Sequence, residues 1–167
     1  GSDYAYAQRP PGNRQSFRTC GGESSVMLQQ DYLMRLFLQF AEGIRRSMDY
    51  GKHDPNEASE SLEDAISRAL DMDADVMLGL EAESFASIVH ISGTDPRVVE
   101  YVVRSLALEA FYLEQAGRTG KSDLRYAQAC ALARAYGVEE PERSRVFTEE
   151  ELAGMLEEDG VVEPSSR

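Results

Sequence analysis

Histidine, cysteine and tryptophan are scarce in this sequence. Its 167 residues include two histidines, two cysteines and no tryptophan. Cys20 and Cys130 are too few for the disulfide framework of a small secreted domain, which favours a reducing, cytoplasmic setting. His53 and His90 lie far apart and have neither the HExxH nor a paired-histidine spacing of a metal site. The sequence therefore predicts no metal site and no cofactor.

Basic residues and long apolar runs are also few. Lys and Arg together number 17 against 30 Asp and Glu, which gives a net charge of −13. Nucleic acids and anionic membranes both require a basic surface, so neither is expected as a partner. No apolar run approaches the roughly 18 residues of a membrane span, and the N-terminal residues lack the apolar region of a signal peptide. We therefore expect a cytoplasmic protein.

The first 26 residues differ in composition from the rest. The segment GSDYAYAQRPPGNRQSFRTCGGESSV is rich in small, polar and proline residues and shows no helical period. Such a segment buries too little apolar surface to offset the entropy of ordering. Residues 1–26 are therefore predicted to be an N-terminal extension without regular structure. We expect Met27, where the composition changes, to be the natural start.

The stretch from Met27 to Tyr50 predicts a central helix. Read at 3.6 residues per turn, its polar side chains form one narrow stripe: Asp31, Arg35, Gln39, Glu42, Arg46 and Asp49. Nearly all other positions are apolar, whereas a surface helix needs an apolar arc of only about 100°. The helix must therefore have neighbours on at least two sides. The middle helices, the N-terminal extension and a second subunit are the candidate neighbours.

Two Asp-Pro pairs predict the starts of two further helices. Asp54 is placed to cap the first, and Pro55 occupies a first turn in which its missing N–H is not needed. We expect this helix to run to Leu70 with one apolar and one acidic face. Asp95 and Pro96 repeat the arrangement, and the following helix is apolar on most sides to about residue 115.

Glycine and hydroxyl residues predict other helix boundaries. Gly51 suits the left-handed position that follows a helix end. Ser122 is expected to cap a helix that ends before Gly137. Thr148 and Glu151 form a capping box for a short helix over about residues 149–159. The helix carries Leu152, Met155 and Leu156, and the many acidic side chains of this C-terminal segment, residues 138–167, are interpreted as a solvated helix face rather than an interaction tail.

Together these elements predict an all-α fold. A hairpin of a long, nearly all-apolar helix and a shorter Ala-rich helix at 27–70 recurs at 95–136, with a weaker helical signal between them. The spacing of Ala58, Leu62 and Ala65 is that of the second helix of a tetratricopeptide repeat, although no strict 34-residue period exists. We expect one domain over residues 27–137, built as about five to six helices in stacked, TPR-like hairpins.

Two short motifs invite a chemical interpretation. Gly117-Arg118-Thr119-Gly120-Lys121-Ser122 resembles the end of a phosphate loop, G-x4-G-K-[ST]. The first glycine position holds Gln115, and the segment follows a helix rather than a buried strand, so a helix–helix turn is favoured. Asp71-x-Asp73-x-Asp75 resembles a calcium loop, but its glycine position is Val76 and its twelfth position is Ala82. No catalytic residue is predicted, and enzymatic activity is not favoured.

The start of the first helix resembles that of a known family. Asp31-Tyr32-Leu33-Met34-Arg35 is similar to the opening D-Y-[IL]-[LM]-R of an uncharacterised bacterial family of helical hairpins. The resemblance covers about residues 27–137 and implies a bacterial protein of TPR-like fold with Met27 as its start. The family has no known activity, so the resemblance implies no catalytic residue.

These observations predict a non-enzymatic protein-interaction or scaffold module. The candidate binding surface, placed to receive an acidic or extended peptide, consists of Arg35, Gln39, Arg46 and Arg104. The same stripe is also explained as a solvated face held by the pairs Asp31–Arg35 and Glu42–Arg46. Two further hypotheses remain: a nucleotide-dependent enzyme or switch that uses residues 117–122, and a structural homodimer formed by surplus apolar helix faces.

Overall fold

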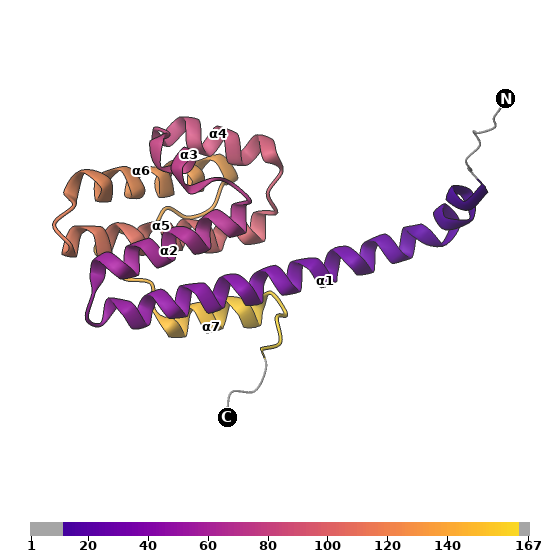
Figure 1. The fold of residues 1–167 in the computed structure, drawn as a ribbon, viewed down its shortest axis with the longest axis horizontal. Coiled ribbons are helices and arrows are strands. Elements are labelled where there is room, and N and C mark those ends of the chain that lie inside the picture. The colour runs from indigo at the N-terminus through magenta and orange to yellow at the C-terminus, as the bar shows by residue number, and fades with distance from the viewer. Residues whose placement is uncertain (1–11, 164–167) are drawn as a thin grey trace. The chain divides into compact units, whose positions relative to one another are not determined.

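The computed structural model describes the backbone of residues 12–163 and the side chains of residues 30–163, Leu78 excepted. This part of the chain is all-α, a fold of helical hairpins without strands (Figure 1). Its helices are α1 (Gly12–Gly51), α2 (Pro55–Leu70), α3 (Ala74–Gly79), α4 (Ala82–Ser92), α5 (Pro96–Gln115), α6 (Thr119–Tyr136) and α7 (Glu149–Glu158). None of these helices is both long enough and apolar enough to cross a membrane.

The chain divides into two compact units, residues 1–35 and residues 36–167. The predicted lack of regular structure over residues 1–26 is wrong for residues 12–26, because α1 already begins at Gly12. Adding a residue to an existing helix costs far less than nucleating one, so a helix nucleated within 27–50 can extend through the polar residues before it. Residues 1–11 lie outside the described part.

The helix starts at the two Asp-Pro pairs are confirmed. The Asp54 carboxylate accepts a hydrogen bond from the backbone N–H of Glu57 at 3.1 Å, and α2 runs from Pro55 to Leu70. Asp95 accepts from the N–H of Arg97 at 2.8 Å. Proline at the first helical position and a capping carboxylate before it are local signals that need no tertiary partner. The Thr148 capping box of α7 is also present.

Two predicted boundary roles are wrong. Gly51 does not have a positive φ, whereas Gly117 and Gly137 do. Gly51 is instead required by space, since a Cβ atom there would lie 2.5 Å from the ring of Tyr112. Ser122 does not cap α6 but lies inside it, where its buried hydroxyl donates to the carbonyl of Ala110 at 2.6 Å. Gly51 and Ser122 therefore contact α5, and neither residue ends or caps a helix in the predicted way.

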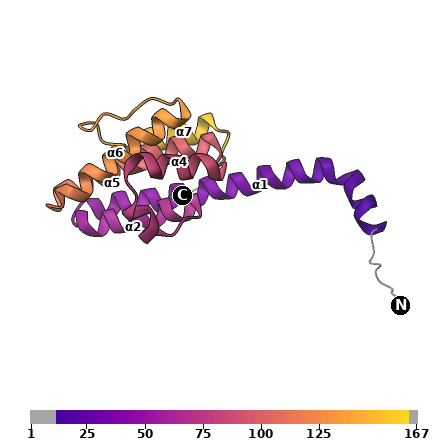
Figure 2. The ribbon, with the colours of Figure 1, turned by 90° about the horizontal axis from the view of Figure 1, so that it is seen from above.

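The core of the second unit forms around α5. Helices α2 and α6 pack against α5, and α4 packs against α6 (Figure 1 and Figure 2). The ring of Tyr101 on α5 lies 5.1 Å from that of Phe37 on α1. α1 and α2 cross closely at Gly43, where a Cβ atom would lie 2.8 Å from the Cβ of Ala65. α5 is buried on nearly every side, as its sequence predicts.

The C-terminal segment belongs to this core. Phe147, Leu152, Leu156 and Val161 are buried, whereas Glu149, Glu150, Glu157 and Glu158 are exposed, as predicted for the acidic face of this helix. Arg45 on α1 donates to the carboxylate of Glu149 at 2.7 Å, which places α7 against α1 (Figure 1). Part of the apolar surface of α1 and α5 is thus covered by a neighbour that was not among the three expected ones.

Candidate functional site

Gln39 and Arg46, two of the four predicted binding residues, lie in one groove between α1 and α2. The groove has a volume of about 310 Å³. It is lined by Leu36, Gln39, Phe40, Glu42, Gly43 and Arg46 from α1 and by Ser61, Asp64, Ala65, Arg68 and Ala69 from α2. Both predicted residues are exposed, because they lie on the polar stripe that the 3.6-residue period predicts.

The rim of the groove carries two ion pairs, one on each helix. Arg46 Nη2 lies 3.7 Å from Glu42 Oε2, which confirms the predicted pair, and Arg68 Nε lies 3.2 Å from Asp64 Oδ2. The two arginine side chains are 57% and 80% exposed, so each pair adds little to stability. Within residues 30–163, each arginine has only this one ion-pair partner. Both guanidinium groups therefore retain N–H groups that a bound segment can use.

The floor of the groove is formed by apolar residues. Phe40 is buried beneath it, and the close crossing at Gly43 and Ala65 brings the two helices together. A volume near 300 Å³ is at the lower end of the range for small-molecule pockets. An apolar side chain on an extended or helical peptide fits this shape better than a large cofactor does.

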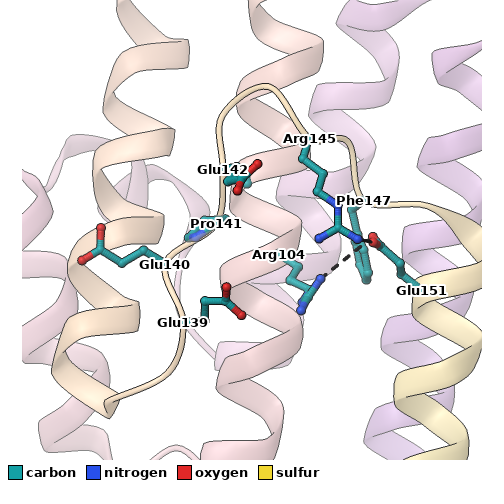
Figure 3. A pocket seen from close by; sticks show the side chains of 9 residues that line it. Arg104, Glu139, Glu140, Pro141, Glu142, Arg145, Phe147 and Glu151 are labelled. Atoms are coloured by element: carbon teal, nitrogen blue, oxygen red, sulfur yellow. Dashed lines mark hydrogen bonds and ion pairs between the residues drawn. The ribbon is translucent and has the colours of Figure 1, made fainter.

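Arg104 lies in a different cavity, of about 60 Å³, between α5 and residues 139–151 (Figure 3). Its guanidinium group lies 3.9 Å from Glu151 and 5.9 Å from the ring centroid of Phe147. Arg145 also pairs with Glu151. The cavity shares no lining residue with the α1–α2 groove. The acidic ligand of Arg104 is thus the chain's own C-terminal segment.

The structure therefore brings two of the four predicted residues together. Gln39 and Arg46 share the groove, Arg104 faces the C-terminal segment, and Arg35 is an exposed residue of the other unit. Periodicity within one helix predicts the exposure of Gln39 and Arg46 that the structure shows. Arg104 is on another helix, and which neighbour it faces depends on tertiary packing.

A buried polar cluster was missed by the sequence reasoning. Arg125 on α6 is fully buried, and its guanidinium group donates to side chains of three residues. Nε donates to Glu109 Oε2 at 3.1 Å, Nη1 to Gln128 Oε1 at 2.9 Å and Nη2 to Glu63 Oε2 at 3.3 Å. Gln128 in turn donates to two backbone carbonyls at the end of α3. The cluster joins α2, α3, α5 and α6.

Glu109 is the unusual member of this cluster. It is fully buried, and its Oε1 has no hydrogen-bond partner among the described residues when the carboxylate is ionised. Burial raises the pKa of Glu109 well above its usual value, the hydrogen bond and charge of Glu63 raise it further, and Arg125 opposes the shift. A proton on Glu109 permits a hydrogen bond to the Glu63 carboxylate. Glu109 therefore keeps its proton to a higher pH than an exposed glutamate does.

This cluster is structural rather than part of a ligand site. Neither the α1–α2 groove nor the Arg104 cavity is lined by any of its members. The one available sequence signal was a glutamate that interrupts the apolar surface of residues 96–115, outside the polar stripe of that helix. Its partner Arg125 follows 16 positions later on another helix, so the pairing needs the packed structure.

The segment at residues 117–122 has the geometry of a helix–helix turn. Gly117 has a φ of +80°, and α6 begins at Thr119, so Lys121 lies in a first helical turn. In a phosphate loop the hydroxyl that follows the lysine binds magnesium. Here that hydroxyl belongs to Ser122, is buried and is hydrogen-bonded to the carbonyl of Ala110. This geometry does not support nucleotide binding.

The other candidate ligands are dispersed. Across the described residues, no three His, Cys, Asp or Glu side chains are grouped as a metal site would need. Asp73 caps α3 by accepting from the N–H of Asp75 at 2.9 Å, as expected for an inter-helix turn. Cys130 is a buried core residue, and burial raises the pKa of its thiol. The side chain of Cys20 lies outside the described part.

Comparison of the chain with protein-family models, curated proteins and solved structures gives no match. The resemblance at Asp31–Arg35 to a bacterial helical family therefore stays a prediction. The α1–α2 groove combines apolar lining residues with two exposed arginines, each held by a single ion pair.

Proposed function

We propose that the chain is a non-enzymatic, TPR-like interaction module that binds a peptide segment of a partner protein in the α1–α2 groove. One observation carries the proposal: Arg46 on α1 and Arg68 on α2 line one groove together with Phe40, Gly43 and Ala65. Stacked helical hairpins commonly bind peptides on such surfaces between helices.

The chemistry of the groove defines the partner segment. Phe40, Gly43 and Ala65 offer contact to one apolar side chain, and the two arginines offer charged hydrogen bonds to carboxylates on either side of it. The net charge of −13 disfavours a strongly acidic partner, because long-range repulsion slows association. We therefore propose a segment with one apolar residue flanked by one or two carboxylates.

Site-specific photo-crosslinking tests this function. A benzophenone amino acid at Ser61, which lines the groove, should capture a defined partner, whereas the same group at exposed Ser92 on α4 should not. Charge reversal of Arg46 and Arg68 to glutamate should abolish capture at Ser61 without loss of helical circular dichroism. Reversal of exposed Lys52 is the matched control and should leave capture intact.

The proposal fails if the products at Ser61 and Ser92 are the same, or if the double reversal leaves capture at Ser61 unchanged. Either result would mean that the stripe is an ordinary solvated helix face. We further propose a cytoplasmic location for the module, on the basis of its two isolated cysteines.

A further inference from the structure

The C-terminal strap, defined as residues 147–163, contacts the rest of its unit in the manner of a bound ligand. Its apolar side chains Phe147, Leu152, Leu156 and Val161 are buried beneath it. Leu152 and Leu156 are four residues apart on α7 and so lie on one helix face. An amphipathic helix that binds in the hydrophobic groove of a partner protein buries one apolar face in the same manner.

Charge is distributed across this contact as in a protein–protein interface. In the ion pairs across this contact the carboxylates belong to the strap and the arginines to α1 and α5, although Glu151 also pairs with Arg145, which directly precedes the strap. Arg45 on α1 pairs with both Glu149 and Glu163, and Arg104 on α5 lies 3.9 Å from Glu151. Complementarity of this kind selects a partner and its orientation more than it adds affinity.

The ion pairs of the strap are partly accessible to solvent, whereas the hydrogen bond from the hydroxyl of buried Tyr101 to Asp159 is part-buried. Arg45 and Glu149 are 30% and 57% exposed, so their attraction is screened by salt. α7 is ten residues long, and a helix of this length is marginal in water without tertiary contacts. The strap therefore gains its helical structure by docking, as a coupled folding and binding segment does.

The connection to α6 allows the strap to leave while it remains tethered. Arg143 lies 5.2 Å from the ring centroid of Tyr126 and donates to Asp123 at 2.6 Å, and the hydroxyl of Tyr126 donates to the carbonyl of Pro141 at 2.7 Å. These contacts hold the start of the connection on α6. Beyond Arg143, the side-chain ion pairs and hydrogen bonds of the strap join it to α1, to α5 and to Arg145.

We propose that this α1–α5 face is a second interaction surface, which binds an amphipathic helix of a partner protein and is occupied in cis by the strap. The partner helix carries two leucines four residues apart and glutamates that meet Arg45 and Arg104. The proposal does not rest on the α1–α2 groove: Arg45 and Arg46 are successive residues, which point about 100° apart around α1.

Hydrogen exchange of the full chain tests whether the strap opens. The amides of α7 should exchange at least tenfold faster than those of α5, and their exchange should accelerate between about 0.1 and 1 M NaCl as the ion pairs are screened. Exchange of the α5 amides should show no such acceleration. If α7 and α5 exchange together at the rate of global unfolding, the strap is an inseparable part of the core and the proposal is overturned.

A fluorescein-labelled peptide with the sequence of residues 145–163 tests whether the face is a binding site. Leu156→Ala in the full chain weakens the strap, so this variant should bind the peptide at least tenfold more tightly than the unmodified chain. Addition of Arg45→Glu should remove that binding, whereas addition of Arg46→Glu, the neighbouring arginine, should not.

The remaining outcomes of the peptide experiment are equally decisive. Equal binding to the unmodified chain and to the Leu156→Ala variant overturns the proposal, as does loss of cooperative unfolding in that variant. Light scattering adds a final check. If the variant forms a dimer at raised concentration, the occupant is the strap of a second copy, and a partner protein is ruled out as the proposed ligand.

Discussion

Replacement of Glu109 by glutamine should stabilise the protein at neutral pH, although it removes a carboxylate that contacts an arginine. Glu109 is fully buried, and its pKa is raised well above the usual value, first by burial and then by Glu63. The folded state then holds a proton that the unfolded chain releases above a pKa of about 4.3. The free energy of unfolding must therefore fall as the pH rises.

The size of this pH dependence is set by the single proton that the folded state holds on Glu109 and the unfolded state releases. While Glu109 is protonated in the folded state and ionised in the unfolded state, the free energy of unfolding falls by about 1.4 kcal/mol per pH unit. The fall begins above the unfolded-state pKa and stops once the pH exceeds the raised pKa of the folded state. Glutamine is isosteric: its carbonyl can accept from Arg125, and its amide can donate to Glu63. Glu109→Gln should therefore lack this slope.

Urea denaturation followed by circular dichroism, from about pH 4 to pH 8, measures both curves. The variant and the unmodified protein should have similar stability near pH 4 and diverge in favour of the variant as the pH rises. Glu114→Gln, at an exposed position on the same helix, should leave the slope unchanged. Parallel curves for Glu109→Gln and the unmodified protein, or a variant that is less stable at every pH, would show that the pKa of Glu109 is not raised and would refute the reasoning.

Three further changes probe the packing of the second unit. Gly43→Ala should be less stable than Gly154→Ala by about 1–3 kcal/mol in denaturation experiments, because a Cβ at Gly43 meets a neighbouring helix at 2.8 Å and one at Gly154 meets nothing. Arg125→Leu should cost about 3–5 kcal/mol by the same assay, since it leaves two carboxyl groups without their partner. Tyr101→Phe should cost about 1 kcal/mol at neutral pH through loss of the 2.8 Å hydrogen bond from its hydroxyl to a carboxylate. Because burial and that bond raise the pKa of Tyr101, the unmodified protein should also lose more stability above about pH 10 than this variant does.

Features that depend on local sequence were predicted well. The boundaries at Asp54 and Asp95 follow from a carboxylate and a proline next to each other, and the exposure of Gln39 and Arg46 follows from helical periodicity. The helical residues 12–26 were missed for the opposite reason. Their composition is unfavourable for an isolated segment, but a helix that is already nucleated extends through it.

Features that depend on pairs of helices were not predictable from the sequence. Gly51 reads as a helix terminator, yet the ring of Tyr112, 61 positions later, is what requires a glycine there. The α2 side of the candidate groove was also not predicted. In the sequence, Arg68 is one basic residue on an otherwise acidic helix face, and nothing there relates it to Arg46. Only the close crossing at Gly43 sets Arg68 beside the groove that Arg46 lines.

The two classes of ion pair in this unit should respond to different perturbations. The Arg125–Glu109 pair is fully buried and the Glu63 side chain is only 14% exposed, so added salt screens the Arg125 pairs weakly, and pH acts on them through Glu109. The pairs of Arg45 are partly exposed, so salt weakens them directly. If the strap is a ligand held in cis, salt should open it while the Arg125 cluster keeps α2, α5 and α6 together. A rise in pH should instead lower the stability of the whole unit. Local opening and global unfolding are thereby separable in one protein without a mutation, and an identical response of α7 and α5 to both perturbations would count against a strap that can leave.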